Sequence, residues 1–122
     1  MNWEQFSVKD EGECRLQQLE GGDTQLACYA MGHLLTGRQR VFSGYQIVIT
    51  LAGREIVAQS QGYSESFRPV LRECNRLVAA QGLRLLVAGN APKYSESPMS
   101  GGAGYGYVEG VSKALKIMSE CP

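Results

Sequence analysis

The chain has little of what most catalytic sites require. Of its 122 residues, one is a histidine, His33, and one is a tryptophan. No serine lies in a Gly-x-Ser-x-Gly turn, so the sequence gives no sign of a serine hydrolase. A Cys–His dyad would have to use His33, which follows Gly32 and is more simply interpreted as a loop histidine. We therefore expect a protein that is not an enzyme.

The cysteines form no recognisable metal-binding or disulfide pattern. They are scattered without a Cys-x-x-Cys pair, at Cys14, Cys28, Cys74 and Cys121. Zinc would need Cys14, Cys28, His33 and a distant fourth ligand, whereas structural zinc sites take their ligands in close pairs. We expect reduced cysteines and neither a metal nor another cofactor. A Cys14–Cys28 disulfide is the alternative.

Net charge and long apolar runs are also missing. The 12 basic and 12 acidic residues cancel, so bulk charge attracts neither nucleic acid nor an anionic membrane. The N-terminus, MNWEQFSVKDEGE, lacks the basic and apolar regions of a secretory signal. No apolar run approaches the roughly 20 residues that span a bilayer. These features predict a cytoplasmic protein that binds neither nucleic acid nor a membrane.

What is present is typical of one folded domain. The chain is 43% hydrophobic and 20% charged, which is ordinary for a globular protein. At this length about two-thirds of the unfolded surface can be buried, so a core forms without disulfides or metals. We expect a single domain over residues 1–122.

The first forty residues give weak strand signals. We expect strands over Trp3–Val8, Cys14–Leu19 and Leu26–Met31. The run Gly21-Gly22-Asp23 would end the second of these strands, and Gly32 would end the third. The polar residues around Gly37 predict a loop over His33–Ser43.

A hairpin is predicted in the centre of the chain. In Tyr45–Leu51, apolar side chains alternate on one face of a strand that is rich in β-branched residues. Ala52-Gly53 supplies a turn, in which Gly53 can take a positive φ without steric penalty. Glu55–Gln61 alternates again and is expected to be the second arm.

The strongest periodic signal predicts a helix after this hairpin. Ser64 or Ser66 would cap it, Pro69 falls in its tolerant first turn, and Gly82 would follow its last turn. Its apolar stripe has the spacing i, i+3, i+4, i+7 and comprises Phe67, Val70, Leu71, Cys74, Leu77 and Val78. In this stripe the thiol of Cys74 would behave as a small hydrophobic group.

The remaining pattern completes an α+β fold. We expect strands over Leu83–Ala88 and Tyr105–Glu109 and a short helix over Ser112–Ser119. The whole is a mostly antiparallel sheet with one long amphipathic helix packed on one face. If the strands before and after that helix are neighbours, they are parallel and joined by a right-handed crossover.

An arginine row is the first of two candidate binding surfaces. Arg68, Arg72 and Arg76 recur every four residues on the exposed face of the expected helix. Like charges at this spacing destabilise a helix by about a few tenths of a kcal/mol, which suggests a site for an acidic partner. A solvated face with Glu65 and Glu73 as neighbours is the alternative.

The segment Asn90–Gly104 is the second candidate surface. Fifteen residues without regular structure are unusual between two strands and are often functional. The residues expected to contact a partner are Lys93, Tyr94, Ser97 and Met99, because aromatic and thioether side chains make good contacts. A mobile loop without a role is the alternative.

A glycine-rich run, Gly101–Gly106, lies at the end of this segment. Such runs hold phosphate when they follow a strand and open a helix. Here the run precedes an expected strand and no Gly-Lys-Ser/Thr follows, which favours a loop entering a strand. A small nucleotide- or phosphate-binding protein or enzyme that uses residues 101–106 is the alternative function.

A sparse pattern of residues runs through the last half of the chain. It consists of Leu71, Gly82-Leu83, Arg84-Leu85-Leu86, Gly89-Asn90, Tyr94, Ser97, Met99, the glycine-rich run and Tyr105. This pattern resembles a loose family of small cytosolic bacterial immunity proteins found with polymorphic or secreted antibacterial toxins. Pro98 stands where the pattern has a small residue. The resemblance implies a protein that binds a cognate toxin in a stoichiometric complex and blocks its active site or substrate access.

Overall fold

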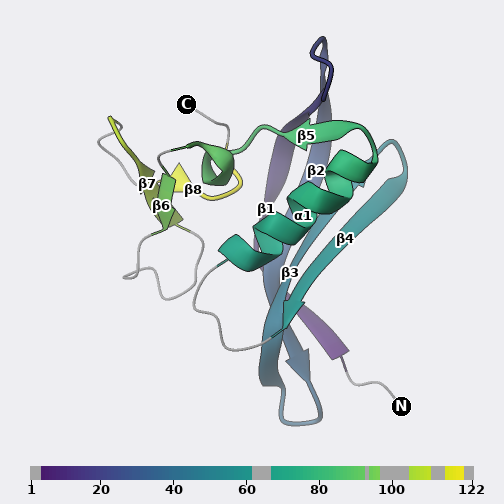
Figure 1. The fold of residues 1–122 in the computed structure, drawn as a ribbon. Helices are drawn as coiled ribbons and strands as arrows, with labels where there is room; N and C mark the ends of the chain where they lie inside the picture. Colours follow the sequence, from purple (N-terminus) through teal and green to yellow (C-terminus); the bar gives the residue numbers. More distant parts are fainter. Residues whose placement is uncertain (1–3, 62–66, 93, 97–104, 111–114, 120–122) are drawn as a thin grey trace.

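Four long antiparallel strands dominate the computed structural model, which describes residues 4–61, 67–92, 94–96, 105–110 and 115–119. They are β1 (Glu4–Gln18), β2 (Thr24–Thr36), β3 (Val41–Leu51) and β4 (Arg54–Gln61). A short strand, β5 (Leu83–Leu85), extends them into a sheet of order β4-β3-β2-β1-β5, in which every neighbouring pair is antiparallel. Helix α1 (Arg68–Ala80) lies across one face of this sheet (Figure 1). The fold is α+β with a mostly antiparallel sheet, as predicted.

A second, smaller sheet lies beside the first (Figure 1). It has the order β6-β7-β8 and consists of β6 (Tyr94–Glu96), β7 (Tyr105–Val108) and β8 (Leu115–Lys116). The predicted strand over Tyr105–Glu109 is thus confirmed. The predicted terminal helix over Ser112–Ser119 is wrong in its described part, because Leu115–Lys116 pairs with β7. Residues 111–114 lie outside the described residues.

The predicted helix forms, but it is not long. At 13 residues α1 is close to the average length of helices in globular proteins. It begins after Phe67, with Pro69 in its first turn, whereas Ser64 and Ser66 lie outside the described residues. Gly82, with φ +76°, follows its end as predicted. The apolar stripe packs on β3, β4 and β5, with Leu77 partly buried and the other five residues buried.

Helix α1 connects the two edges of the main sheet. It leaves β4 at one edge and leads to β5 at the other, so the strands before and after it are not neighbours. The condition for a parallel crossover pair is therefore not met. Instead, β5 pairs antiparallel with the end of β1, where Leu85 lies opposite Leu16.

The N-terminal half is more regular than its sequence suggests. The stretch expected as two strands is one strand, β1, because its polar centre continues to pair with β2. The loop expected over His33–Ser43 shrinks to a turn, since β2 extends to Thr36 and β3 begins at Val41. The turn between them contains Gly37 (φ +78°) and Arg40 (φ +53°).

Gly32 does not end a strand; it lies within β2 and allows β1 to pass close to it. A β-bulge between Val8 and Asp10 bends β1 where it passes Gly32. A Cβ atom on Gly32 would overlap the carbonyl oxygen of Ser7 and come within 2.9 Å of the Cα of Val8. Glycine is therefore required here by the close approach of two backbones.

The central hairpin is confirmed. Leu51 pairs with Arg54 across a two-residue turn in which Ala52 and Gly53 have φ values of +50° and +78°. Two successive positive φ values give the turn whose twist matches antiparallel strands. Alternation along β3 buries Tyr45, Ile47, Ile49 and Leu51 on the side of the helix.

Two cysteines contribute to the core under α1. Cys14 and Cys74 are buried, and Cys28 is exposed. Cys14 lies opposite Ala27 in the ladder and Cys28 lies opposite Glu13, so the two thiols point to opposite faces of the sheet. This excludes the Cys14–Cys28 disulfide. Burial raises the pKa of Cys14 to about 11 and that of Cys74 to about 12, so both remain neutral thiols.

Replacing Gly32 by alanine is expected to destabilise the protein by about 1–3 kcal/mol, because β1 must move away from β2. Gly12→Ala in β1 is the matched control, since its nearest neighbours are side-chain atoms of Tyr29 at 3.4 Å or more. Urea unfolding followed by circular dichroism measures both variants. Equal stability of the two would contradict the assigned role of Gly32.

Thiol labelling tests the cysteine assignment. In a Cys121→Ser background, we expect Cys28 alone to react quickly with a disulfide reagent in the folded protein, because the thiolate is the reacting form. Cys28→Ser should remove the fast phase, and urea should release Cys14 and Cys74. A second fast thiol in the folded protein would show that Cys14 or Cys74 is not buried.

The raised pKa values of Cys14 and Cys74 should lower the stability of the protein as the pH rises above 9.0, since the unfolded chain loses thiol protons that the folded chain keeps.

Candidate functional site

The two predicted binding surfaces meet at the start of α1. The Arg68 guanidinium donates a hydrogen bond of 2.6 Å from Nη2 to the carbonyl oxygen of Tyr94 in β6. Its central carbon lies 5.8 Å from the centre of the Tyr94 ring, which is within range of a cation–π contact. Arg68 therefore joins the helix to the small sheet.

A cationic hollow opens beside this contact. It has a volume of about 260 Å³ and lies between α1 and the 3₁₀ turn η1 (Ala88–Asn90). Its lining residues are Arg68, Leu71, Arg72, Asn75, Gly89 and Asn90. Arg72 is exposed and, within the described part of the chain, forms no hydrogen bond or ion pair. One arginine of this hollow is thus held in place and the other is available to a partner.

An apolar hollow adjoins the cationic one. It has a volume of about 390 Å³ and lies between the second half of α1 and the segment from β5 to Pro92. Most of its wall is aliphatic, from Leu19, Ala79, Leu83, Leu85, Leu86, Val87, Ala91 and Pro92, and Arg84 is the one charged residue among the described residues that line it. Asn75 and Asn90 line both hollows. We call the two hollows together the α1 groove.

A pair of asparagine amides holds the two walls of the α1 groove together. Asn75 donates to Asn90 over 2.7 Å, and Asn90 donates back over 2.9 Å. The Asn90 amide also donates to the carbonyl oxygen of Leu85 over 2.9 Å. Backbone bonds from Ala88 to Ser119 and from Gly89 to Ile117, each 2.8 Å, fix η1 from behind. The groove is therefore built before any partner binds.

Only some of the predicted contact residues lie at the α1 groove. Arg76 forms an ion pair with Glu73 instead of lining either hollow, and its hydrogen bonds lower the pKa of Glu73. Tyr94 is 3% exposed and packs in the core. Contrary to the prediction, its ring is therefore not available to a partner. Lys93, Ser97 and Met99 lie outside the described residues.

The segment Asn90–Gly104 is partly regular rather than a loop throughout. Tyr94–Glu96 pairs with β7, because a short antiparallel partner satisfies its backbone groups. Of the glycine-rich run, residues 101–104 lie outside the described residues, and Tyr105–Gly106 begins β7. A Cβ atom on Gly106 would overlap the Ser95 carbonyl oxygen, so this glycine permits close strand packing.

His33 is not a loop residue. It lies in β2 within an aromatic cluster, with ring centres 5.3 Å from Phe42, 5.2 Å from Tyr45 and 5.9 Å from Phe67. Such distances are those of packed aromatic side chains. The described residues contain no group of three or more metal-ligating side chains.

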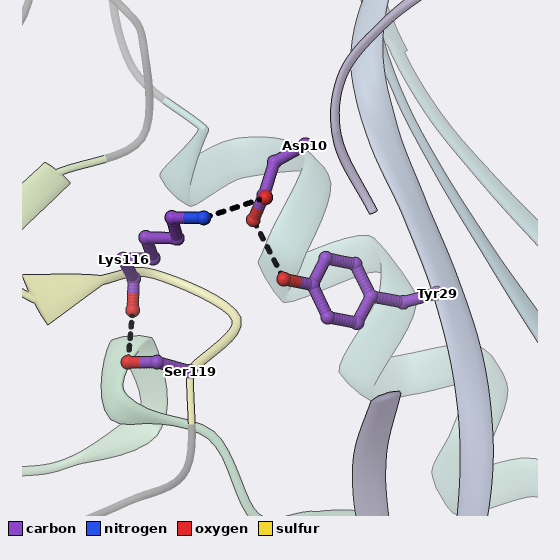
Figure 2. A network of polar contacts seen from close by, with 4 residues as sticks. All are labelled: Asp10, Tyr29, Lys116 and Ser119. Atoms are coloured by element: carbon purple, nitrogen blue, oxygen red, sulfur yellow. Dashed lines mark hydrogen bonds and ion pairs between the residues drawn. The ribbon is translucent and has the colours of Figure 1, made fainter. Parts of the chain in front are cut away.

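A second polar cluster joins the two sheets (Figure 2). The bulge in β1 turns the Asp10 carboxylate toward Tyr29, which donates to it over 2.6 Å, and toward the Lys116 ammonium at 3.1 Å. Ser119 donates over 2.6 Å to the Lys116 carbonyl oxygen. A carboxylate, a phenol and an amine also occur together in acid–base sites. Here Asp10 is only 13% exposed and lines neither hollow, so we assign the cluster to anchoring β8 on β1.

Comparison with known protein families, curated proteins and solved structures finds no match to this chain. Among the described helices, none has the length and apolar character needed to cross a membrane.

Beyond Arg68, Arg72 and Asn90, sequence reasoning missed the residues that shape the α1 groove. Asn75 could have been placed, because it lies seven residues after Arg68 and so on the same side of a helix. The wall opposite α1 could not have been predicted, because Leu19, Leu86 and Asn90 come together only through the pairing of β5 with β1.

Loss of the asparagine bridge should loosen the α1 groove. Asn90→Ala removes three hydrogen bonds and is expected to lower stability by about 1–2 kcal/mol, because these groups are partly solvated. Asn75→Ala removes two of the three and should be milder. Urea unfolding compares the variants. Equal effects would mean that the bond to Leu85 contributes nothing.

Proposed function

We propose that this chain is an immunity protein, which binds a cognate antibacterial toxin in a stoichiometric complex and so neutralises it. It acts in the cytoplasm as a binding protein and not as an enzyme. The observation that carries the proposal is the α1 groove, a preformed surface with an available arginine and an apolar wall.

The composition of the α1 groove suits a protein partner. Protein interfaces combine an apolar centre with a polar rim, and arginine is enriched in them. Here the apolar hollow supplies the centre, and Arg72 and Arg84 supply part of the rim. Because the amide bridge and backbone bonds already order both walls, little conformational entropy is lost on binding.

Of the described residues that carry the resemblance to immunity proteins, most line this groove. Leu71, Gly89 and Asn90 line the cationic hollow. Leu83, Leu85 and Leu86 line the apolar one. Tyr94 holds Arg68 through its carbonyl oxygen. This gathering supports the groove as the surface through which such a protein would contact its toxin.

A small phosphate-bearing ligand is the second candidate. Arg68 and Arg72 both line one hollow of about 260 Å³, and guanidinium groups pair well with phosphate. This candidate predicts that nucleotides or phosphorylated metabolites raise the melting temperature. The first candidate predicts that they do not.

The decisive experiment expresses a toxin encoded next to this chain in cells with and without it. We expect the chain to restore growth and to form a complex with the toxin on a sizing column. Arg72→Glu should weaken the complex at least tenfold, because it places a like charge against an acidic contact. Arg40→Glu, which makes the same charge change in the β2–β3 turn, should not. Absence of both rescue and complex would refute the proposal.

A further inference from the structure

One wall of the α1 groove is a single side of the helix. Arg68, Arg72, Asn75 and Ala79 have the spacing i, i+4, i+7, i+11, which places them on a single stripe. Eleven residues of helix rise about 16 Å. An extended chain covers that length in about five residues. The groove is thus long enough for a short peptide segment rather than a single side chain.

The two ends of the α1 groove differ in chemistry. At the start of α1, the hollow is lined by Arg68, whose guanidinium is held by Tyr94, and by the exposed Arg72. Toward the end of α1, the wall is aliphatic, and Leu19 is 49% exposed in it. A segment that complements both ends needs a negative group at one end and a large apolar side chain at the other.

The middle of the α1 groove offers hydrogen bonds to a peptide backbone. The Asn90 amide uses both of its N–H groups, one on Asn75 and one on Leu85. Asn75 uses one N–H and accepts one bond, so its amide keeps one donor and one lone pair within the described part of the chain. One donor and one acceptor side by side match the N–H and C=O of a peptide unit.

We propose that the α1 groove binds an extended segment of about five residues of the toxin, in which a carboxylate meets Arg72 and a large apolar side chain fills the aliphatic hollow. The identity of the partner rests on the proposed function, whereas the chemistry of the segment rests on the groove. Since side chains on one face of an extended chain alternate, the acidic and apolar residues are two or four positions apart.

A random peptide library displayed on phage is the probe for this specificity. Peptides are selected on the immobilised wild-type protein and counter-selected on an Arg72→Glu/Leu19→Ser variant. We expect enriched sequences with Asp or Glu two or four residues from Leu, Ile, Phe or Trp. Enrichment of basic sequences, or of none, would overturn the inference.

Matched substitutions then test each end with the enriched peptide. Arg72→Glu should weaken binding at least tenfold and Leu19→Ser about threefold to tenfold, and high salt should weaken wild-type binding. The controls are Arg40→Glu and Val41→Ser, because Val41 is 53% exposed and both residues lie at the opposite end of the sheet from β5. Equal loss in the controls, or none in the groove variants, would place the peptide elsewhere.

Three further outcomes separate this inference from its alternatives. A concentration-dependent dimer of the chain that Arg72→Glu abolishes would overturn the inference, because a second copy would then occupy the groove. If growth rescue fails while the acidic–apolar peptides bind as expected, the immunity function falls and the groove specificity stands. If the Arg72→Glu and Leu19→Ser variants restore growth as well as the wild type does, the immunity function is supported and the proposed peptide specificity of the groove is refuted.

Discussion

Burial of the apolar stripe of α1 against the main sheet determines where the other parts of the molecule lie. The stripe must cover β3, β4 and β5 together, so the helix runs from one edge of the sheet to the other. The chain therefore leaves the helix beside the edge of β1 that does not pair with β2, and there β5 pairs with β1 as an edge strand. The 3₁₀ turn and the small sheet follow directly from that position (Figure 1). The α1 groove exists because the chain passes the helix again after β5.

The elements with strong local signals could be predicted from the sequence. The hairpin around Ala52-Gly53 and the helix ending before Gly82 are fixed by alternation, periodicity and positive-φ turns, which act over a few residues. The single strand β1 and the full length of β2 could not be predicted, because the polar centre of β1 and the residues of β2 beyond Gly32 are held in place by the pairing of the two strands. The sequence predicts a strand end at Gly32, whereas the role of this glycine is steric and depends on a bulge in another strand.

The candidate site was predictable only on its helical side. Arg68 and Arg72 were found from spacing alone, and both line the groove. Spacing could not show that Arg76 turns to Glu73, nor that Tyr94 packs inward and offers its carbonyl oxygen to Arg68. The three arginines therefore have three roles: one fastens the small sheet to the helix, one is available to a partner, and one pairs on the surface. A row of like charges in sequence does not act as one site.

The division between the rim of the groove and the core beneath it has an evolutionary consequence. The rim residues Leu19, Arg72, Ala79 and Pro92 are exposed, whereas the side chains that secure the fold are buried. Substitutions at exposed positions usually change stability by less than about 0.5 kcal/mol. The rim can therefore diversify rapidly while the scaffold stays the same. Under the proposed function, a change in the partner can be matched by altering a few surface side chains while the buried core stays the same.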